Sequence, residues 1–247
     1  MTSPPRLYFS FRSPFSWLLV ERLRRVAPDA LEQVELFPYW EPDMDTAAGL
    51  ARHDAVIHYA PMSKAKHLYI LQDTKRLATR LGLTLSWPVD VEPWWEPAHL
   101  GWLQARRLGG AGAFYDGIVA ARWRAGLDIS KREVIRDVAD SVGLDGNAIC
   151  AAVDDREVRD LGVDCLLQAY RDDVFGVPYM RVGWRRFWGF DRLADFLAEA
   201  GLHLEAGPGE LARSSGRQDD EGGLSGVPLA VRELVGCYDN DTAGGCG

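Results

Sequence analysis

Paired cysteines are missing from this chain of 247 residues. Its four cysteines, Cys150, Cys165, Cys237 and Cys246, form no CxxC pair. Their spacing argues against a disulfide scaffold, a zinc ribbon and a dithiol redox enzyme. We therefore expect neither a metal site nor thiol chemistry from the chain's own cysteines.

Long apolar runs and excess basic charge are missing as well. No stretch of about 18 apolar residues occurs, so no membrane span is expected, and the absence of a basic start with an apolar segment predicts a cytoplasmic protein. The 28 Lys and Arg residues are outnumbered by 36 Asp and Glu, so no nucleic-acid partner is expected. Nine Trp residues indicate a large apolar core or a pocket for a flat small molecule.

The last 45 residues differ in composition from the rest. Residues 203–247 hold ten of the 25 glycines, and their eight acidic and three basic residues give a net charge of −5. Such a Gly-rich acidic tail is expected to be mostly disordered. Within it, only residues 227–235 have the pattern of a short helix.

The hydrophobic pattern divides the remaining chain into three parts. Residues 6–40 predict a β-α-β unit, residues 41–153 an all-helical segment, and residues 154–202 a helix, a Gly-Val-Pro loop, a β-hairpin and a helix. The expected helices are residues 15–26, 63–81, 97–108, 113–125, 131–142, 147–153, 156–170 and 189–200. The expected strands are residues 6–11, 33–37, 179–182 and 185–188. This order predicts an α/β protein with a thioredoxin-like fold and an inserted all-helical domain.

The junction of the first strand and helix reads Ser13-Pro14-Phe15-Ser16. Thioredoxin-type folds carry C-P-x-C here, and two serines exclude thiol–disulfide exchange by this motif. A helix N-terminus still offers free N–H donors and about half a positive charge, which stabilise a thiolate supplied by a cofactor. Ser13 would then donate its hydroxyl to that sulfur. The spacing alone favours a simpler role as the helix N-cap.

Three further positions suit a peptide-like thiol. A cis Pro178 would leave the backbone of Val177 free to pair with such a ligand, although an ordinary turn proline is the alternative. Asp191 either stabilises the start of the last helix or binds an ammonium group. Lys66 either faces solvent or meets a ligand carboxylate.

Aromatic residues near these motifs are candidates for the wall of an apolar substrate slot. His99 is a candidate acid–base or ligand contact. Core packing is the alternative for every member of the set. The candidates are Phe15, Trp17, Trp40, Trp94, Trp95 and His99.

Four segments together resemble one enzyme family. They are Tyr8 to Trp17, Lys66 with Tyr69, Phe175 to Pro178, and Phe187 to Leu193. As a set they are similar to 2-hydroxychromene-2-carboxylate isomerases, relatives of kappa-class glutathione transferases in the DsbA-like group. The resemblance covers about residues 6–202.

The resemblance implies a glutathione site between the two domains. It places the sulfur at Ser13, backbone pairing at Val177 ahead of cis Pro178, the γ-glutamyl end at Phe190 and Asp191, and Lys66 beside the tripeptide. The family's Asn-x-Pro-Pro segment before the lysine is absent here. Because only four of the 28 basic residues are Lys, the sequence indicates a GC-rich source such as an actinobacterium, so mycothiol is an alternative thiol.

The leading hypothesis is a thiol-dependent isomerase of an electron-poor double bond. Its substrate would be a small aromatic or polyketide-like molecule, from aromatic catabolism or secondary metabolism. A transferase that conjugates the thiol, and a non-catalytic DsbA-like protein, remain alternatives. The resemblance is also compatible with a homodimer.

Overall fold

The computed structural model describes residues 3–57 and 62–203. The predicted tail and its helix at 227–235 lie outside these residues. The strands are β1 (Arg6–Phe9), β2 (Glu35–Pro38), β3 (Tyr179–Val182) and β4 (Arg185–Trp188). The α-helices are α1 (Pro14–Val26), α2 (Ala30–Gln33), α3 (Met44–Ala51), α4 (Lys64–Arg80), α5 (Glu96–Arg107), α6 (Ala111–Val119), α7 (Arg132–Ser141), α8 (Gly146–Cys150), α9 (Arg156–Arg171) and α10 (Leu193–Ala200).

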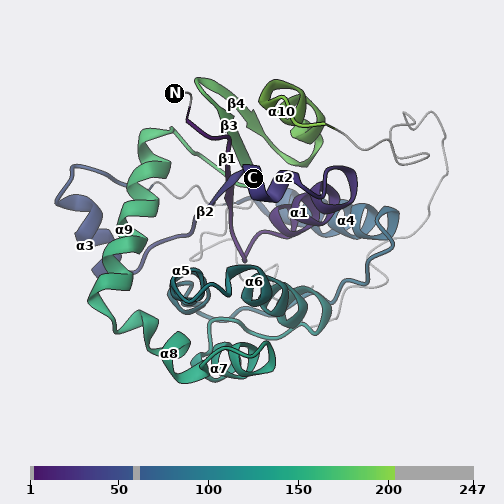
Figure 1. Cartoon of the computed structure of the whole chain (residues 1–247). Coiled ribbons are helices and arrows are strands. Elements are labelled where there is room, and N and C mark those ends of the chain that lie inside the picture. Colours follow the sequence, from purple (N-terminus) through teal and green to yellow (C-terminus); the bar gives the residue numbers. More distant parts are fainter. Residues whose placement is uncertain (1–2, 58–61, 204–247) are drawn as a thin grey trace.

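The sheet has the order β2-β1-β3-β4, with β1 at its centre (Figure 1). Strand β1 runs parallel to β2 and antiparallel to β3, so Leu7 pairs with Leu36 on one side and Met180 on the other. Figure 1 shows α5 to α8 grouped at the end of the sheet where β1 turns into α1. This arrangement is the expected thioredoxin-like fold with added helices.

Several elements differ from the sequence expectation. The final helix starts later, because Gly189 has a φ of 103° and residues Phe190–Arg192 form a 3-10 turn before α10. Helix α6 ends earlier than expected and continues as a π-helix over Ala120–Arg124. The short helices α2 and α3 were not predicted.

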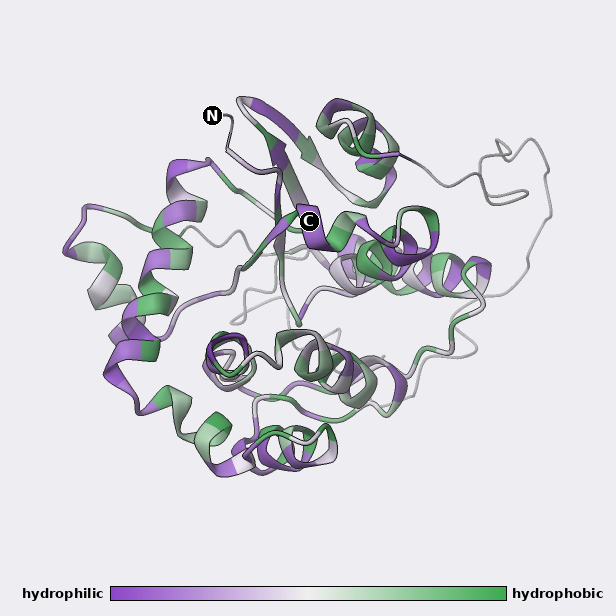
Figure 2. Ribbon diagram, in the orientation of Figure 1, coloured by the Kyte–Doolittle hydropathy of each residue, from purple (hydrophilic) through white to green (hydrophobic). Residues whose placement is uncertain are grey.

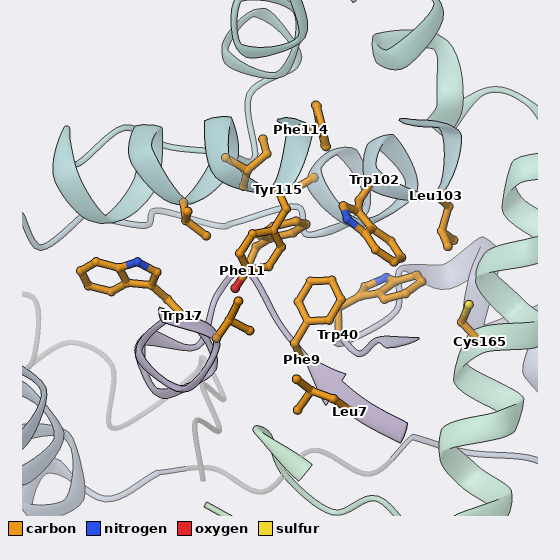
Figure 3. Packing of buried hydrophobic residues seen from close by; sticks show 14 of the residues in the cluster. Leu7, Phe9, Phe11, Trp17, Trp40, Trp102, Leu103, Phe114, Tyr115 and Cys165 are labelled. Atoms are coloured by element: carbon orange, nitrogen blue, oxygen red, sulfur yellow. The ribbon is translucent and has the colours of Figure 1, made fainter. Parts of the chain in front are cut away.

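The core gathers around the central strand. Phe9 is fully buried, and its ring meets Phe11, Trp102 and Tyr115 edge to face at 5.2–5.4 Å (Figure 3). Trp102 and Tyr115 belong to α5 and α6, so this aromatic cluster joins the sheet to the helical segment. Figure 2 shows apolar and polar residues interleaved along α9, as in a helix with one buried face. Within the described residues, every helix is too short or too polar to cross a bilayer.

Removing the central ring should destabilise the whole fold. We expect Phe9→Ala to lower the free energy of unfolding by about 3–5 kcal/mol, because it opens a cavity between the sheet and two helices. Phe175→Ala is the matched control, since the Phe175 side chain is 65 % exposed. Urea unfolding followed by circular dichroism measures both. Equal losses in the two variants would contradict this view of the core.

Candidate active site at the N-terminus of α1

Ser13 caps α1, as the sequence spacing favoured. Its Oγ accepts a hydrogen bond from the Ser16 N–H at 3.3 Å, and Pro14 occupies the first helical position. The Ser13 N–H donates to the Ser10 carbonyl oxygen at 3.1 Å. Ser13 is completely buried, so its hydroxyl lies in a medium where hydrogen bonds are stronger than in water.

The structure brings the cis-proline loop to this cap. The Val177–Pro178 peptide bond is cis, and the Ser13 Oγ donates to the Val177 carbonyl oxygen at 3.4 Å. The Gly189 N–H donates to the Pro178 carbonyl oxygen at 3.0 Å, which ties the loop to the end of β4. Two motifs separated by 164 residues therefore meet at one helix N-terminus.

The predicted ligand-end residues belong to two segments that pack against α1. The Phe190 ring lies under the Arg22 guanidinium at 5.1 Å, and its carbonyl oxygen accepts from Arg22 Nη1 at 3.4 Å. Asp191 is exposed and pairs with Arg192 at 3.3 Å. Lys66 is exposed in the first turn of α4, which packs on α1. Their roles toward a ligand stay predictions.

The aromatic candidates are mostly engaged with other protein groups. Trp17 is buried, stacked on Trp123 at 6.0 Å. Trp95 is buried between two guanidinium groups, those of Arg12 at 5.1 Å and Arg122 at 5.0 Å. Trp40 is buried and donates through Nε1 to Glu96. These three rings therefore have the core contacts that the sequence left as the alternative.

Two aromatic candidates are only partly buried. Phe15 packs against Met62 and Ile70 at the start of α4. Trp94 donates through Nε1 to Asp43 Oδ2 at 3.1 Å. The substrate slot stays a prediction, and Phe15 is the member of the set nearest to the Ser13 cap along the chain.

His99 is completely buried, and both of its ring nitrogens contact the protein. Nε2 lies 3.2 Å from the Ser10 Oγ, and Nδ1 lies 2.7 Å from the Trp95 carbonyl oxygen. Burial lowers the pKa of His99 to about 3, so the ring is neutral at physiological pH. In this structure the imidazole faces the turn that leads to Ser13.

The sequence did not predict a pair of carboxylates beside these residues, of which Glu96 is buried and Asp43 is partly buried. Burial raises the pKa of Glu96 to about 7. Burial alone would also raise the pKa of Asp43, but Arg159, the Thr46 N–H and Trp94 lower it to about 2. Asp43 and Glu96 lie 53 residues apart, so no local sequence pattern contains both. The local pattern that could have pointed to Asp43 is its position as the helix N-cap that accepts from the Thr46 N–H. Among the described residues, no group of three or more His, Cys, Asp or Glu side chains is arranged to hold a metal ion.

The chain is similar to known proteins over most of its length. Residues 6–200 match the family model described as DSBA-like thioredoxin domain. A 2-hydroxychromene-2-carboxylate isomerase from Sphingobium xenophagum is 31 % identical over 202 residues, covering 80 % of this chain and 97 % of the relative. A Pseudomonas putida protein of the same name is 26 % identical over 212 residues, covering 84 % of this chain and 95 % of its own length.

Solved structures agree with the fold. A 2-hydroxychromene-2-carboxylate isomerase superposes with a TM-score of 0.60 at 22 % identity, covering 80 % of this chain and 94 % of that chain. A probable DsbA oxidoreductase from Streptomyces coelicolor superposes with a TM-score of 0.58 at 14 % identity, covering 87 % and 96 %.

The chain therefore belongs to the DSBA-like thioredoxin family. The curated relatives are named 2-hydroxychromene-2-carboxylate isomerases, which confirms the resemblance found in the sequence and supports an isomerase.

The raised pKa of Glu96 gives a testable pH dependence. Between pH 4.5, its ordinary pKa, and about 7, folded protein holds a proton that the unfolded chain has released. Raising the pH through this window therefore lowers the free energy of unfolding. Glu96→Gln has no titrating group at this position. From the lower to the upper end of the window, its free energy of unfolding should therefore rise by roughly 3 kcal/mol relative to that of wild type.

Urea unfolding at four pH values between 4.5 and 7.5 measures this difference. His99, with its lowered pKa, acts in the opposite direction, but its contribution is common to both proteins and cancels. Glu157→Gln changes an exposed carboxylate and is the control. A variant-minus-wild-type difference that does not change with pH would contradict a raised pKa at Glu96.

Proposed function

We propose that this protein is a thiol-dependent isomerase that acts on an electron-poor double bond next to a carbonyl group. The observation that carries the proposal is the buried contact of Ser13 with Val177 at the N-terminus of α1. At this point the DsbA-like fold has the Ser13 hydroxyl and the backbone N–H groups of the α1 N-terminus as donors, and the motif contains no cysteine. The substrate is a small aromatic or polyketide-like molecule, in keeping with the names of the relatives.

The donor set suits a low-molecular-weight thiol, either glutathione or mycothiol. When bound, the thiol supplies a thiolate that adds to the double bond and is eliminated after rotation. The Ser13 hydroxyl, which donates to the Val177 carbonyl oxygen in this structure, would donate to the sulfur instead when the thiol is bound. The α1 N-terminus adds its partial positive charge. Both donors stabilise negative charge more strongly because Ser13 is buried.

The residues around α1 would hold the rest of the cofactor. The backbone of Val177 pairs with a peptide-like group, and Asp191 and Phe190 meet an ammonium-bearing end. Lys66, in the first turn of α4, binds a carboxylate. The charges of Asp191 and Lys66 are complementary to the ammonium and carboxylate groups that a γ-glutamyl tripeptide carries.

Replacing the cap serine tests the central role. We expect Ser13→Ala to lower kcat for glutathione- or mycothiol-dependent isomerisation of 2-hydroxychromene-2-carboxylate by about 10²–10³-fold, because one preorganised donor is lost. Ser141→Ala removes a hydroxyl that donates to the Val138 carbonyl oxygen in α7 and should retain wild-type turnover. Chromatography with mass detection follows the product.

Product mass separates the two enzyme hypotheses. An unchanged mass supports the isomerase, whereas a mass increased by that of the thiol supports a conjugating transferase at the same site. Turnover that does not depend on either thiol, or that survives Ser13→Ala, would refute the proposed role of the cap.

The exposed lysine of α4 should affect binding more than turnover. We expect Lys66→Gln to raise the Kd for glutathione roughly tenfold, equivalent to about 1.4 kcal/mol, while kcat at saturating glutathione changes little. Lys75→Gln is the matched control, because Lys75 is also exposed on α4. Thermal-shift titration measures both. Equal affinities in the two variants would remove Lys66 from the site.

A further inference from the structure

His99 connects the helical segment to the turn that precedes Ser13. Its Nε2 lies 3.2 Å from the Ser10 Oγ and 3.2 Å from the Phe11 backbone nitrogen. Its Nδ1 lies 2.7 Å from the carbonyl oxygen of Trp95, one turn earlier in the chain. The side chain therefore reaches from α5 to the end of β1.

The partners of the imidazole determine where its proton lies. The Trp95 carbonyl oxygen can only accept, so Nδ1 carries the hydrogen. Nε2 then presents a lone pair to the Phe11 N–H and the Ser10 O–H. Burial keeps the pKa of His99 near 3, so this neutral tautomer persists over the pH range in which the protein would work.

Ser10 connects this contact to Ser13. Its Oγ accepts from the Arg12 N–H at 3.3 Å, and its carbonyl oxygen accepts from the Ser13 N–H at 3.1 Å. Its own N–H donates to the Ser16 Oγ at 3.2 Å. Ser16 in turn donates its N–H to the Ser13 Oγ at 3.3 Å. The turn is thus a closed set of hydrogen bonds, which His99 contacts from outside.

Neighbouring rings fix the orientation of the imidazole. Trp40 stacks on His99 at 5.1 Å and 13°, and Phe11 contacts it at 5.3 Å and 48°. Trp40 is itself held by its hydrogen bond to Glu96. The imidazole therefore cannot turn its Nε2 away from Ser10 and Phe11 without displacing packed aromatic groups.

We propose that His99 is a positioning residue of this site: it accepts from Ser10 and Phe11 and so holds the Ser13 hydroxyl at the N-terminus of α1, facing Val177. The inference deepens the proposed function and rests on it for its kinetic consequences. His99 bonds to Ser10 and Phe11 and not to Ser13, so its effect must pass through the turn.

Two substitutions separate the acceptor from the ring. His99→Phe keeps an aromatic ring but removes the acceptor, so we expect kcat of the thiol-dependent reaction to fall at least tenfold. His99→Gln can place an oxygen near the position of Nε2, so it should recover a large part of that loss. Ser10→Ala removes the hydroxyl partner of His99, so its kcat should lie between those of wild type and His99→Phe.

The second readout is the acidity of the bound thiol. Absorbance at about 240 nm follows thiolate formation as the pH of the enzyme–glutathione complex is varied. A displaced Ser13 stabilises the thiolate less, so the pKa of bound glutathione should rise in His99→Phe. Leu100→Ala is the control: Leu100 is buried in the same helix against Gly162, so it should cost stability without moving this pKa.

A double-mutant cycle tests whether the effect passes through Ser13. If it does, Ser13→Ala and the double variant with His99→Phe should have kcat values within about threefold of each other. Reductions in kcat that multiply in the double variant would overturn the positioning role. So would a wild-type kcat in His99→Phe, or a kcat in His99→Gln no higher than that of His99→Phe.

Nuclear magnetic resonance keeps the inference testable if the proposed function fails. The imidazole ¹⁵N signals should report a hydrogen on Nδ1 from pH 5 to 9, and the Ser13 amide should exchange faster with solvent in His99→Phe or, if that variant does not fold, in Ser10→Ala. Absence of thiol-dependent turnover in wild type would refute the function alone. Unchanged Ser13 exchange in a folded variant would refute the positioning role itself.

Discussion

The buried polar groups at the end of β1 must all find partners, and this requirement shapes the site. The chain turns from β1 into α1 in contact with α5, where unpaired N–H and hydroxyl groups would be costly. His99 satisfies Ser10 and Phe11 from one side, and Val177 accepts from Ser13 on the other. The turn consequently exists in this form only when two distant segments of the chain, those of His99 and Val177, are assembled around it.

Thioredoxin-type folds with C-P-x-C at this turn carry out thiol–disulfide exchange, whereas this chain has a serine at each end of the motif. Ser13 and Ser16 occupy the ends of the motif, and each hydroxyl is used within the protein: Ser16 accepts from Ser10, and Ser13 caps the helix. A cysteine thiol is a much weaker hydrogen-bonding group than a hydroxyl. The serines therefore give a hydrogen-bonded turn that has no thiol of its own, which is why the proposed chemistry needs a thiol supplied from outside.

Local patterns predicted what local forces determine. Strands β3 and β4 were expected with their observed bounds, because Gly183 supplies a left-handed turn residue between them. The Ser13 cap was also predicted from a local pattern, a serine followed by a proline at the first helical position. Helix α3 was missed because it is short, and Asp43 at its N-cap is bound by Arg159 of α9. No sequence window contains that contact.

Residue type alone could not separate core from site among the aromatic residues. Trp17, Trp40 and Phe15 are equally apolar in sequence, yet only Phe15 is partly exposed. Apolar packing such as that of Phe9 against Trp102 tolerates small shifts, whereas the hydrogen bonds that His99 accepts from Ser10 and Phe11 are satisfied in one arrangement. The aromatic cluster thus supplies the attraction between the sheet and the helical segment, and the buried polar contacts select the one docking position in which Ser13 meets Val177.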